Sequence, residues 1–224
     1  MPYRNVLNFT TFFLIIVLTI LIVIFFFPTQ NKELIIILKE LTSIITPIIG
    51  VMLFWRGVVQ YEKDQRWKNA EFVAKEINEF KSDPVIKNVM LMLDWKIRDI
   101  KLSECESFSL EDDIYEELYL SLVPKTYEGE KDGFTKRQAL IRDHFDIFFD
   151  YLEKFEAFIE VGLLDKKDFD PYLHYWLHLI GDKNNVRKPS KFYETIWQYI
   201  HFFRYKRVQK LMSRYGYSIK TNVK

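Results

Sequence analysis

Two histidines four residues apart, His174 and His178, form the pattern in this chain that is most typical of a metal site. Residues at i and i+4 share one face of a helix, so the two imidazoles can bind one ion. Asp170 lies one turn earlier, and His144 is a candidate for a remote third ligand. The segment is otherwise aromatic and lacks the glutamate of the metalloprotease pattern. A structural or surface role is the stronger interpretation, and a metal-dependent enzyme at His174 and His178 is an alternative.

A basic segment near the C-terminus, residues 201–215, is the second candidate, because its cations alternate with aromatic residues. Guanidinium and ammonium groups bind anionic ligands through charge-assisted hydrogen bonds. In a membrane-tethered protein, such a segment can also contact lipid phosphates. The competing interpretation is a helix that packs through its apolar residues and exposes a basic face. The candidate anion-binding residues are Arg204, Lys206, Arg207, Lys210 and Arg214.

Other patterns that could carry catalysis are incomplete. The carboxylates of Asp143, Asp146, Asp150 and Glu153 suit a cation site or acid–base pair, but we interpret them as the solvated face of an amphipathic helix. Cys105 is flanked by two glutamates, which favour the neutral thiol and make it a poor nucleophile. No phosphate-binding glycine loop or serine nucleophile elbow is present. The sequence therefore predicts no catalytic residue and no cofactor.

Charge and cysteine content restrict the class of protein further. The 224 residues carry 32 basic and 31 acidic side chains, so the net charge is only +1. Such a balance argues against a protein that binds a nucleic-acid duplex through a basic field. The single cysteine excludes an intramolecular disulfide, which fits a reducing compartment.

Two apolar segments near the N-terminus predict a transmembrane hairpin. Residues 9–27 carry no charge and have the length of about 20 residues that a bilayer requires. They are longer than a signal-peptide core, and no small-residue cleavage site follows. We place the first span at about 8–27. The second, at about 41–60, is entered through an interfacial turn at Lys39 and Glu40, and Pro47 and Gly50 indicate a kink or a close helix contact.

Basic residues determine the predicted orientation, since they concentrate on the cytosolic side of spans. Arg4 precedes the first span, whereas Lys63 and Arg66 follow the second. The two lysines of the connecting loop are offset by two glutamates. The pattern predicts a multi-pass protein of the plasma membrane with both termini in the cytosol. Its predicted membrane-interface residues are Trp55, Arg56 and Tyr61.

The rest of the chain predicts a helical stalk over 61–82 and a cytosolic helical domain over 83–224. Apolar residues at helical spacing predict a long helix over 136–161 and a stalk stripe through Val73, Ile77 and Phe80. Cap and proline signals predict helix starts at Asp83, Ser109 and Asp170.

A final helix over 190–215 is predicted to bend near Arg204. Alternation over 95–102 indicates a short strand. The predicted fold is mainly α, a two-helix transmembrane hairpin followed by a cytosolic α-helical domain, with room for one short strand pair.

Several stretches of the soluble part also carry a resemblance. They are residues 66–72 (RWKNAEF), 92–95 (MLDW), 162–164 (GLL), 171–176 (PYLHYW), 208–211 (VQKL) and 214–217 (RYGY). With these stretches the chain resembles a group of uncharacterised bacterial membrane-anchored helical proteins. The resemblance covers most of the soluble part. It implies a protein of the bacterial inner (plasma) membrane without an assigned activity and transfers no catalytic residue.

The leading functional hypothesis is a membrane-tethered cytosolic helical module, non-enzymatic, that binds a protein partner or itself. The alternative is a sensor–effector whose cytosolic domain binds a small anionic signal and whose oligomerised hairpins perturb the membrane, as some bacterial antiphage effectors do. The expected partners are the lipid bilayer, a protein or second copy of the chain and, for the alternative, a small anion.

Overall fold

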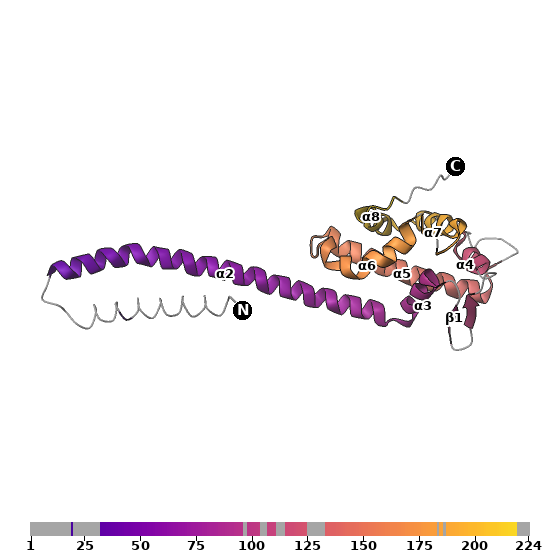
Figure 1. The fold of residues 1–224 in the computed structure, drawn as a ribbon, viewed down its shortest axis with the longest axis horizontal. Coiled ribbons are helices and arrows are strands. Elements are labelled where there is room, and N and C mark those ends of the chain that lie inside the picture. Colours follow the sequence, from indigo (N-terminus) through magenta and orange to yellow (C-terminus); the bar gives the residue numbers. More distant parts are fainter. Residues whose placement is uncertain are drawn as a thin grey trace. The chain divides into compact units, whose positions relative to one another are not determined.

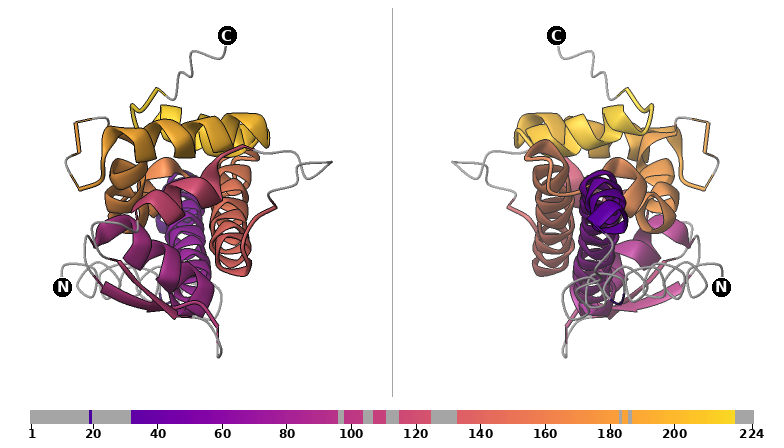
Figure 2. Two further views of the ribbon diagram at one scale, coloured as in Figure 1. Left: turned by 90° about the vertical axis from the view of Figure 1, so that its right-hand side faces the viewer. Right: turned by 90° about the vertical axis from the view of Figure 1, so that its left-hand side faces the viewer.

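The computed structural model of the chain describes residues 19, 32–95, 98–103, 107–110, 115–124, 133–182, 184–185 and 187–218. The chain divides into two compact units, Met1–Gln65 and Arg66–Lys224, hereafter unit 1 and unit 2. Their described parts are mainly helical, with one two-stranded sheet in unit 2 (Figures 1 and 2). The predicted first span, 8–27, lies outside the described residues apart from Thr19.

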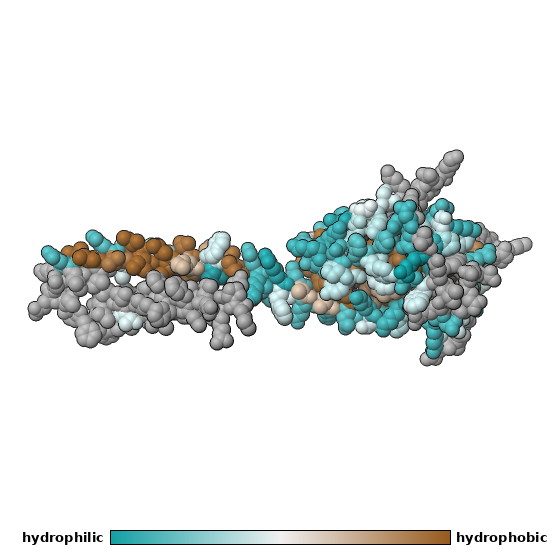
Figure 3. Space-filling model, viewed as in Figure 1, coloured by the Kyte–Doolittle hydropathy of each residue, from teal (hydrophilic) through white to brown (hydrophobic). Residues whose placement is uncertain are grey.

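Helix α2, Lys32–Ser82, contributes to both units. Its unit 1 portion carries large apolar side chains that are exposed, and Figure 3 shows them as a brown band. Within the described residues, α2 is long and apolar enough to cross a membrane. The interfacial turn predicted at Lys39 and Glu40 is wrong, since the helix already begins at Lys32. Locally, the hydroxyl of Thr42 donates to the carbonyl of Lys39, and that of Ser43 donates to Glu40, so these polar groups are satisfied without breaking the helix.

The unit 2 portion of α2 packs along α5, Lys136–Glu160. Ring contacts join Phe72 to Phe158 at 5.2 Å and Phe80 to Phe155 at 5.3 Å between centroids. Between them, the carboxylate of Glu76 lies 2.6 Å from the ammonium of Lys154. Higher numbers in α2 meet lower numbers in α5, so the two helices run antiparallel. The predicted stalk stripe is buried on α5 through Val73, Ile77 and Phe80.

Helix α5 is the centre of the core of unit 2. Thr135 and Gln138 form a capping box at its start, which satisfies backbone N–H groups that the first turn leaves free. Gly162, with φ of +72°, follows its end. The predicted apolar stripe is confirmed, because all of its members are buried: Ile141, Phe145, Phe148, Leu152, Phe155 and Ile159.

Helix α3, Pro84–Asp94, starts as predicted, with the Asp83 carboxylate accepting from the amide of Val85 at 2.8 Å. Its last carbonyls are bound by cations from the loop before α7: Arg187 donates to the Asp94 carbonyl at 3.0 Å, and Lys188 donates to the Trp95 carbonyl. Cations at a helix C-terminus are favoured by the helix dipole. This loop therefore fastens the end of α3.

The predicted strand is β1, Arg98–Lys101, which pairs antiparallel with β2, Ser107–Leu110. The helix start predicted at Ser109 is wrong, because Ser109 pairs with Asp99 in this sheet. Helix α4, Tyr115–Leu122, follows later in the chain.

Helix α6, Lys166–Gly181, begins before the predicted Asp170. A capping box between Asp165 and Asp168 starts it one turn earlier, and Pro171 lies inside the helix. The predicted bend near Arg204 is a complete break between α7, Ser190–Phe202, and α8, Lys206–Arg214. Arg204 has φ of +57°, a left-handed conformation that a right-handed helix does not contain.

Candidate functional site

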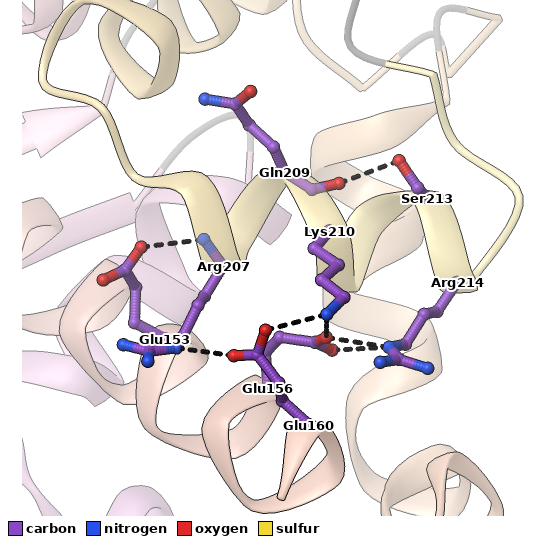
Figure 4. Close-up of polar contacts among 8 residues, drawn as sticks. All are labelled: Glu153, Glu156, Glu160, Arg207, Gln209, Lys210, Ser213 and Arg214. Carbon is purple, nitrogen blue, oxygen red and sulfur yellow. Dashed lines mark hydrogen bonds and ion pairs between the residues drawn. The ribbon is translucent and has the colours of Figure 1, made fainter.

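The basic residues of α8 lie against acidic residues of α5, as Figure 4 shows. The Nε of Arg207 donates to the carboxylate of Glu160 at 3.0 Å, and the Nζ of Lys210 donates to its second oxygen at 2.8 Å. The backbone amide of Arg207 donates to Glu153 at 3.0 Å, which satisfies a free N–H in the first turn of α8. We call this contact the α5–α8 charge interface.

Glu156 is the innermost member of the α5–α8 charge interface and is fully buried. The Nε of Arg214 lies 2.8 Å from both of its carboxylate oxygens. Lys210 adds a second cation at 3.8 Å. A buried carboxylate is tolerated only with such charged partners, because desolvating an unpaired ion costs several kcal/mol. Arg214, which is partly exposed, therefore links α8 to a carboxylate of α5 that lies in the core.

The electrostatics of α5 vary along its polar face. Hydrogen bonds from Lys210 and Arg207 hold the pKa of Glu160 below its usual range. By contrast, burial and the neighbouring carboxylates of Asp146 and Glu153 raise the pKa of Asp150. The negative charge of Glu160 at the end of α5 is thus balanced by the cations of α8.

Three of the five candidate anion-binding residues, Arg207, Lys210 and Arg214, make these ion pairs. An anion would have to compete there with carboxylates already in place. The side chains of Arg204 and Lys206 are exposed and have no partner among the residues that the structure describes. The five candidate anion-binding residues therefore fall into two groups. Three form ion pairs with α5, and the side chains of the other two contact no charged partner among the described residues.

Asp146 joins α5 to both C-terminal helices. One of its carboxylate oxygens accepts from the hydroxyl of Tyr205 at 2.8 Å and from the hydroxyl of Tyr199. Burial, followed by these contacts with Asp146, raises the pKa of both tyrosines, so they remain protonated donors. Nearby, the Arg142 guanidinium lies 5.0 Å from the centroid of Tyr199 and 4.6 Å from that of Phe203. These contacts fix the α7–α8 junction to α5.

The candidate metal residues are not brought together into a larger ligand set. The Nδ1 of His174 lies 3.7 Å from Asp170, and that of His178 lies 3.2 Å from the hydroxyl of Tyr217. No group of three metal-ligating side chains occurs among the described residues. His144 is buried in the core instead.

The predicted membrane-interface residues lie on the unit 1 portion of α2. Trp55 and Tyr61 are 67% and 65% exposed, and their role at a membrane interface stays a prediction. Arg56 is also exposed.

Sequence reasoning missed Glu156 and the roles of Asp146 and Arg142. For Glu156, the sequence contains a usable signal. The acidic residues of α5 and the cations of α8 repeat the same spacing of three and then four residues, which gives each set one helix face. The matching sets are Glu153, Glu156 and Glu160 on α5, and Arg207, Lys210 and Arg214 on α8.

No protein-family model, curated protein or solved structure matches this chain. The resemblance to bacterial membrane-anchored proteins stays a prediction from the residues that carry it.

Proposed function

We propose that this protein is a membrane-tethered helical module that binds a protein partner or a second copy of itself and performs no catalysis. The main supporting observation is that the apolar stretch of α2 is exposed. Within its most apolar 18 residues, no part is buried. Burying apolar area stabilises by roughly 25 cal/mol per Å². A continuous apolar surface of this kind is stable in lipid and unstable in water.

The proposal includes a hairpin of two spans, 8–27 and a second one within α2, with both termini in the bacterial cytosol. The distribution of basic residues supports this orientation. Tags at the two ends of the chain test it. Both should resist protease in intact spheroplasts and be cut after lysis, whereas cleavage of either tag in intact spheroplasts would contradict the hairpin.

Alkaline carbonate extraction of membranes tests the tether itself. The full chain should stay in the membrane pellet and enter solution only with detergent. Recovery in the carbonate supernatant would overturn the proposal. A peripheral control protein must be released in the same extraction.

The module function is tested by the mass and metal content of the detergent-solubilised protein. We expect a metal-free oligomer or a stable complex with another protein. A metal-free monomer without a partner would contradict the proposal. Stoichiometric zinc that is lost in His174→Ala, but retained in the control His201→Ala, would favour the metalloenzyme alternative instead.

The sensor–effector remains a second candidate because the side chains of Arg204 and Lys206 are exposed on the α7–α8 junction. Binding of inorganic phosphate, followed by calorimetry, tests it. Under this alternative, replacing both residues by Gln abolishes binding. The matched control replaces the exposed Lys75 and Lys87 by Gln. Equal behaviour of the two double variants would remove this candidate.

A further inference from the structure

Helix α7 ends in a turn that glycine usually completes, and an arginine occupies the glycine position. The amide of Tyr205 donates to the carbonyl of Ile200 at 3.1 Å, and the amide of Arg204 donates to the carbonyl of His201 at 3.1 Å. These two hydrogen bonds form a Schellman motif, in which the residue at the position of Arg204 is left-handed and is most often glycine. Arg204 adopts this conformation with φ of +57°. The turn therefore carries a long cationic side chain where the backbone disfavours one.

The fold of unit 2 gives this cation no partner. The side chains of Arg204 and Lys206 are exposed and make no ion pair, hydrogen bond or ring contact among the described residues. Figure 4 shows that the other cations of α8 point towards α5, where they are paired. Strained residues of this kind cost stability and cluster at functional sites. We therefore looked for a binding role at this junction.

Two phenylalanine rings are exposed immediately before the left-handed residue. Phe202 is 47% exposed and Phe203 is 38% exposed. The two rings meet edge-on, with 4.9 Å between their centroids. Phe203 also lies 4.6 Å from the ring centroid of the buried Tyr199 and 4.6 Å from the guanidinium of Arg142, so it is held against the core. Aromatic residues that are ordered before binding are typical of protein interfaces. We call this surface the junction patch, and its members are Phe202, Phe203, Arg204 and Lys206.

The carboxylates of α5 neutralise the junction patch only in part. Asp146 accepts from the hydroxyls of Tyr199 and Tyr205, and Glu153 accepts from a backbone amide of α8. After burial and Asp146, the charge of Asp150 also raises the pKa of Tyr205, which places this carboxylate near the patch. Asp150 is one carboxylate against two cations, so the patch stays positive.

This combination of charge and apolar surface favours an acidic partner that also carries an apolar side chain. Cations without intramolecular partners attract carboxylates, and the exposed rings gain from being covered by apolar surface. A second copy of the chain is a poor occupant, because a two-fold symmetric contact sets the patch against itself. The cations of the two copies would then repel each other.

We propose that the junction patch is the docking surface for an acidic segment of a different protein. Carboxylates of the segment pair with Arg204 and Lys206, while one of its apolar side chains covers Phe202 and Phe203. This inference rests on the proposed module function and specifies its surface and the chemistry of its partner. Raising the salt concentration weakens the ion pairs and leaves the apolar contact, so binding falls with salt without being abolished.

Selection from a random peptide library displayed on phage tests the proposal. The bait is the full chain in phosphatidylcholine nanodiscs, and empty nanodiscs remove peptides that bind lipid. A parallel selection uses the double variant Arg204→Gly, Lys206→Gln. Peptides enriched only on the native chain should combine aspartate or glutamate with an aromatic or aliphatic residue. Absence of such peptides overturns the junction patch.

Affinities of one enriched peptide for single variants assign its contacts. Fluorescence anisotropy should show that Phe202→Ala and Lys206→Gln each raise the Kd about tenfold. The matched controls are Leu163→Ala, which is 48% exposed, and the exposed Lys87→Gln; both should leave the Kd within about twofold of the native value. Equal effects of patch and control variants overturn the proposal. Phe202→Ala also separates a peptide from a small anion, since phosphate binding through the two cations would not need the ring.

Arg204→Gly separates a binding role from a structural one. Glycine suits the Schellman motif, so the melting temperature should not fall, while the Kd for the peptide rises about tenfold. Undiminished peptide binding in this variant overturns the junction patch. If the native chain and the patch variants form the same oligomer or complex, the patch is overturned and the module function stands. A metal-free monomer that selects no peptide overturns both.

Discussion

At the scale of single residues, Glu156 and its partners decide how α8 is held. The carboxylate is fully buried, while the Arg214 side chain that binds it is 33% exposed. Removing the cation leaves a buried carboxylate with only the longer contact to Lys210. Removing an exposed cation without a described partner changes little.

Arg214→Gln should therefore lower the free energy of unfolding by about 3 kcal/mol, the cost of breaking one side of a buried ion pair. Urea denaturation of the protein in detergent measures the change. The matched control is Lys206→Gln on the same helix, which should stay within about 0.5 kcal/mol of the native value. Equal effects of the two changes would contradict a buried ion pair.

His144 gives a second prediction, for pH dependence. Burial lowers its pKa, and the nearby carboxylates of Asp143 and Asp83 offset this in part. Its Nδ1 has no hydrogen-bond partner among the described residues. Since the folded protein takes up the proton at lower pH than the unfolded chain does, stability falls as the pH drops below about 6.5.

His144→Leu should reduce this loss of stability between about pH 6.5 and the lowered pKa of the native imidazole, because the unfolded chain then gains no proton at this position. Thermal unfolding at a series of pH values measures it. The exposed His174 changed to Gln is the control. An unchanged slope in His144→Leu would show that another group dominates the acid sensitivity.

Local signals in the sequence were sufficient for some residues and insufficient for others. The cap Asp83 acts on an amide two residues away, so neighbouring residues reveal it. Glu156 was missed because its burial depends on a helix 50 residues later. Asp146 was interpreted as solvated, whereas two tyrosines from the C-terminal helices bind it.

At the scale of elements, nonlocal pairing explains the errors. Ser109 has the sequence context of a helix start, but pairing with Asp99 holds it in β2. The start of α6 was placed at the Asp170–Pro171 signal, although Asp165 and Asp168 form a complete capping box earlier. The apolar stripe of α5 was predictable because 3.6-residue periodicity persists over the whole helix.

The junction between α7 and α8 yields a prediction at this scale. Arg204 adopts φ of +57°, a region that costs an L-residue about 1–2 kcal/mol. Glycine removes that cost but loses more entropy on folding, by roughly 0.5–1 kcal/mol. Arg204→Gly should therefore raise the free energy of unfolding slightly, by up to about 1 kcal/mol.

Gln198→Gly is the matched control for the Arg204 change, since it places glycine at an exposed position inside α7. It should destabilise by about 1 kcal/mol. Both variants are compared by urea denaturation. Destabilisation of similar size in the two variants would contradict the strain at Arg204.

At the scale of the whole molecule, the buried apolar core is confined to one unit. Every buried hydrophobic residue that the structure describes lies between Val73 and Tyr215, all in unit 2. The exposed apolar residues of α2 before Val59 contribute nothing to that core. Composition had already separated an apolar N-terminal part from a charged remainder, so this division was predictable from the sequence.

A fragment Arg66–Lys224 should therefore be soluble without detergent and unfold cooperatively near the melting temperature of the full chain. Circular dichroism and analytical ultracentrifugation measure both properties. The fragment Arg66–Arg204, which lacks α8, is the control and should fail to unfold cooperatively. Aggregation of both fragments would show that unit 2 requires unit 1.

The contact of α8 with α5 also affects the order of events during synthesis. The apolar part of α2 leaves the ribosome long before α8, while unit 2 is still incomplete. Until Lys210 and Arg214 emerge, Glu156 lacks the cations that permit its burial. A chain that stops before α8 therefore exposes an unfinished core, the kind of surface that aggregates or is degraded. The buried position of Glu156 thus becomes available only once α8 has been synthesised.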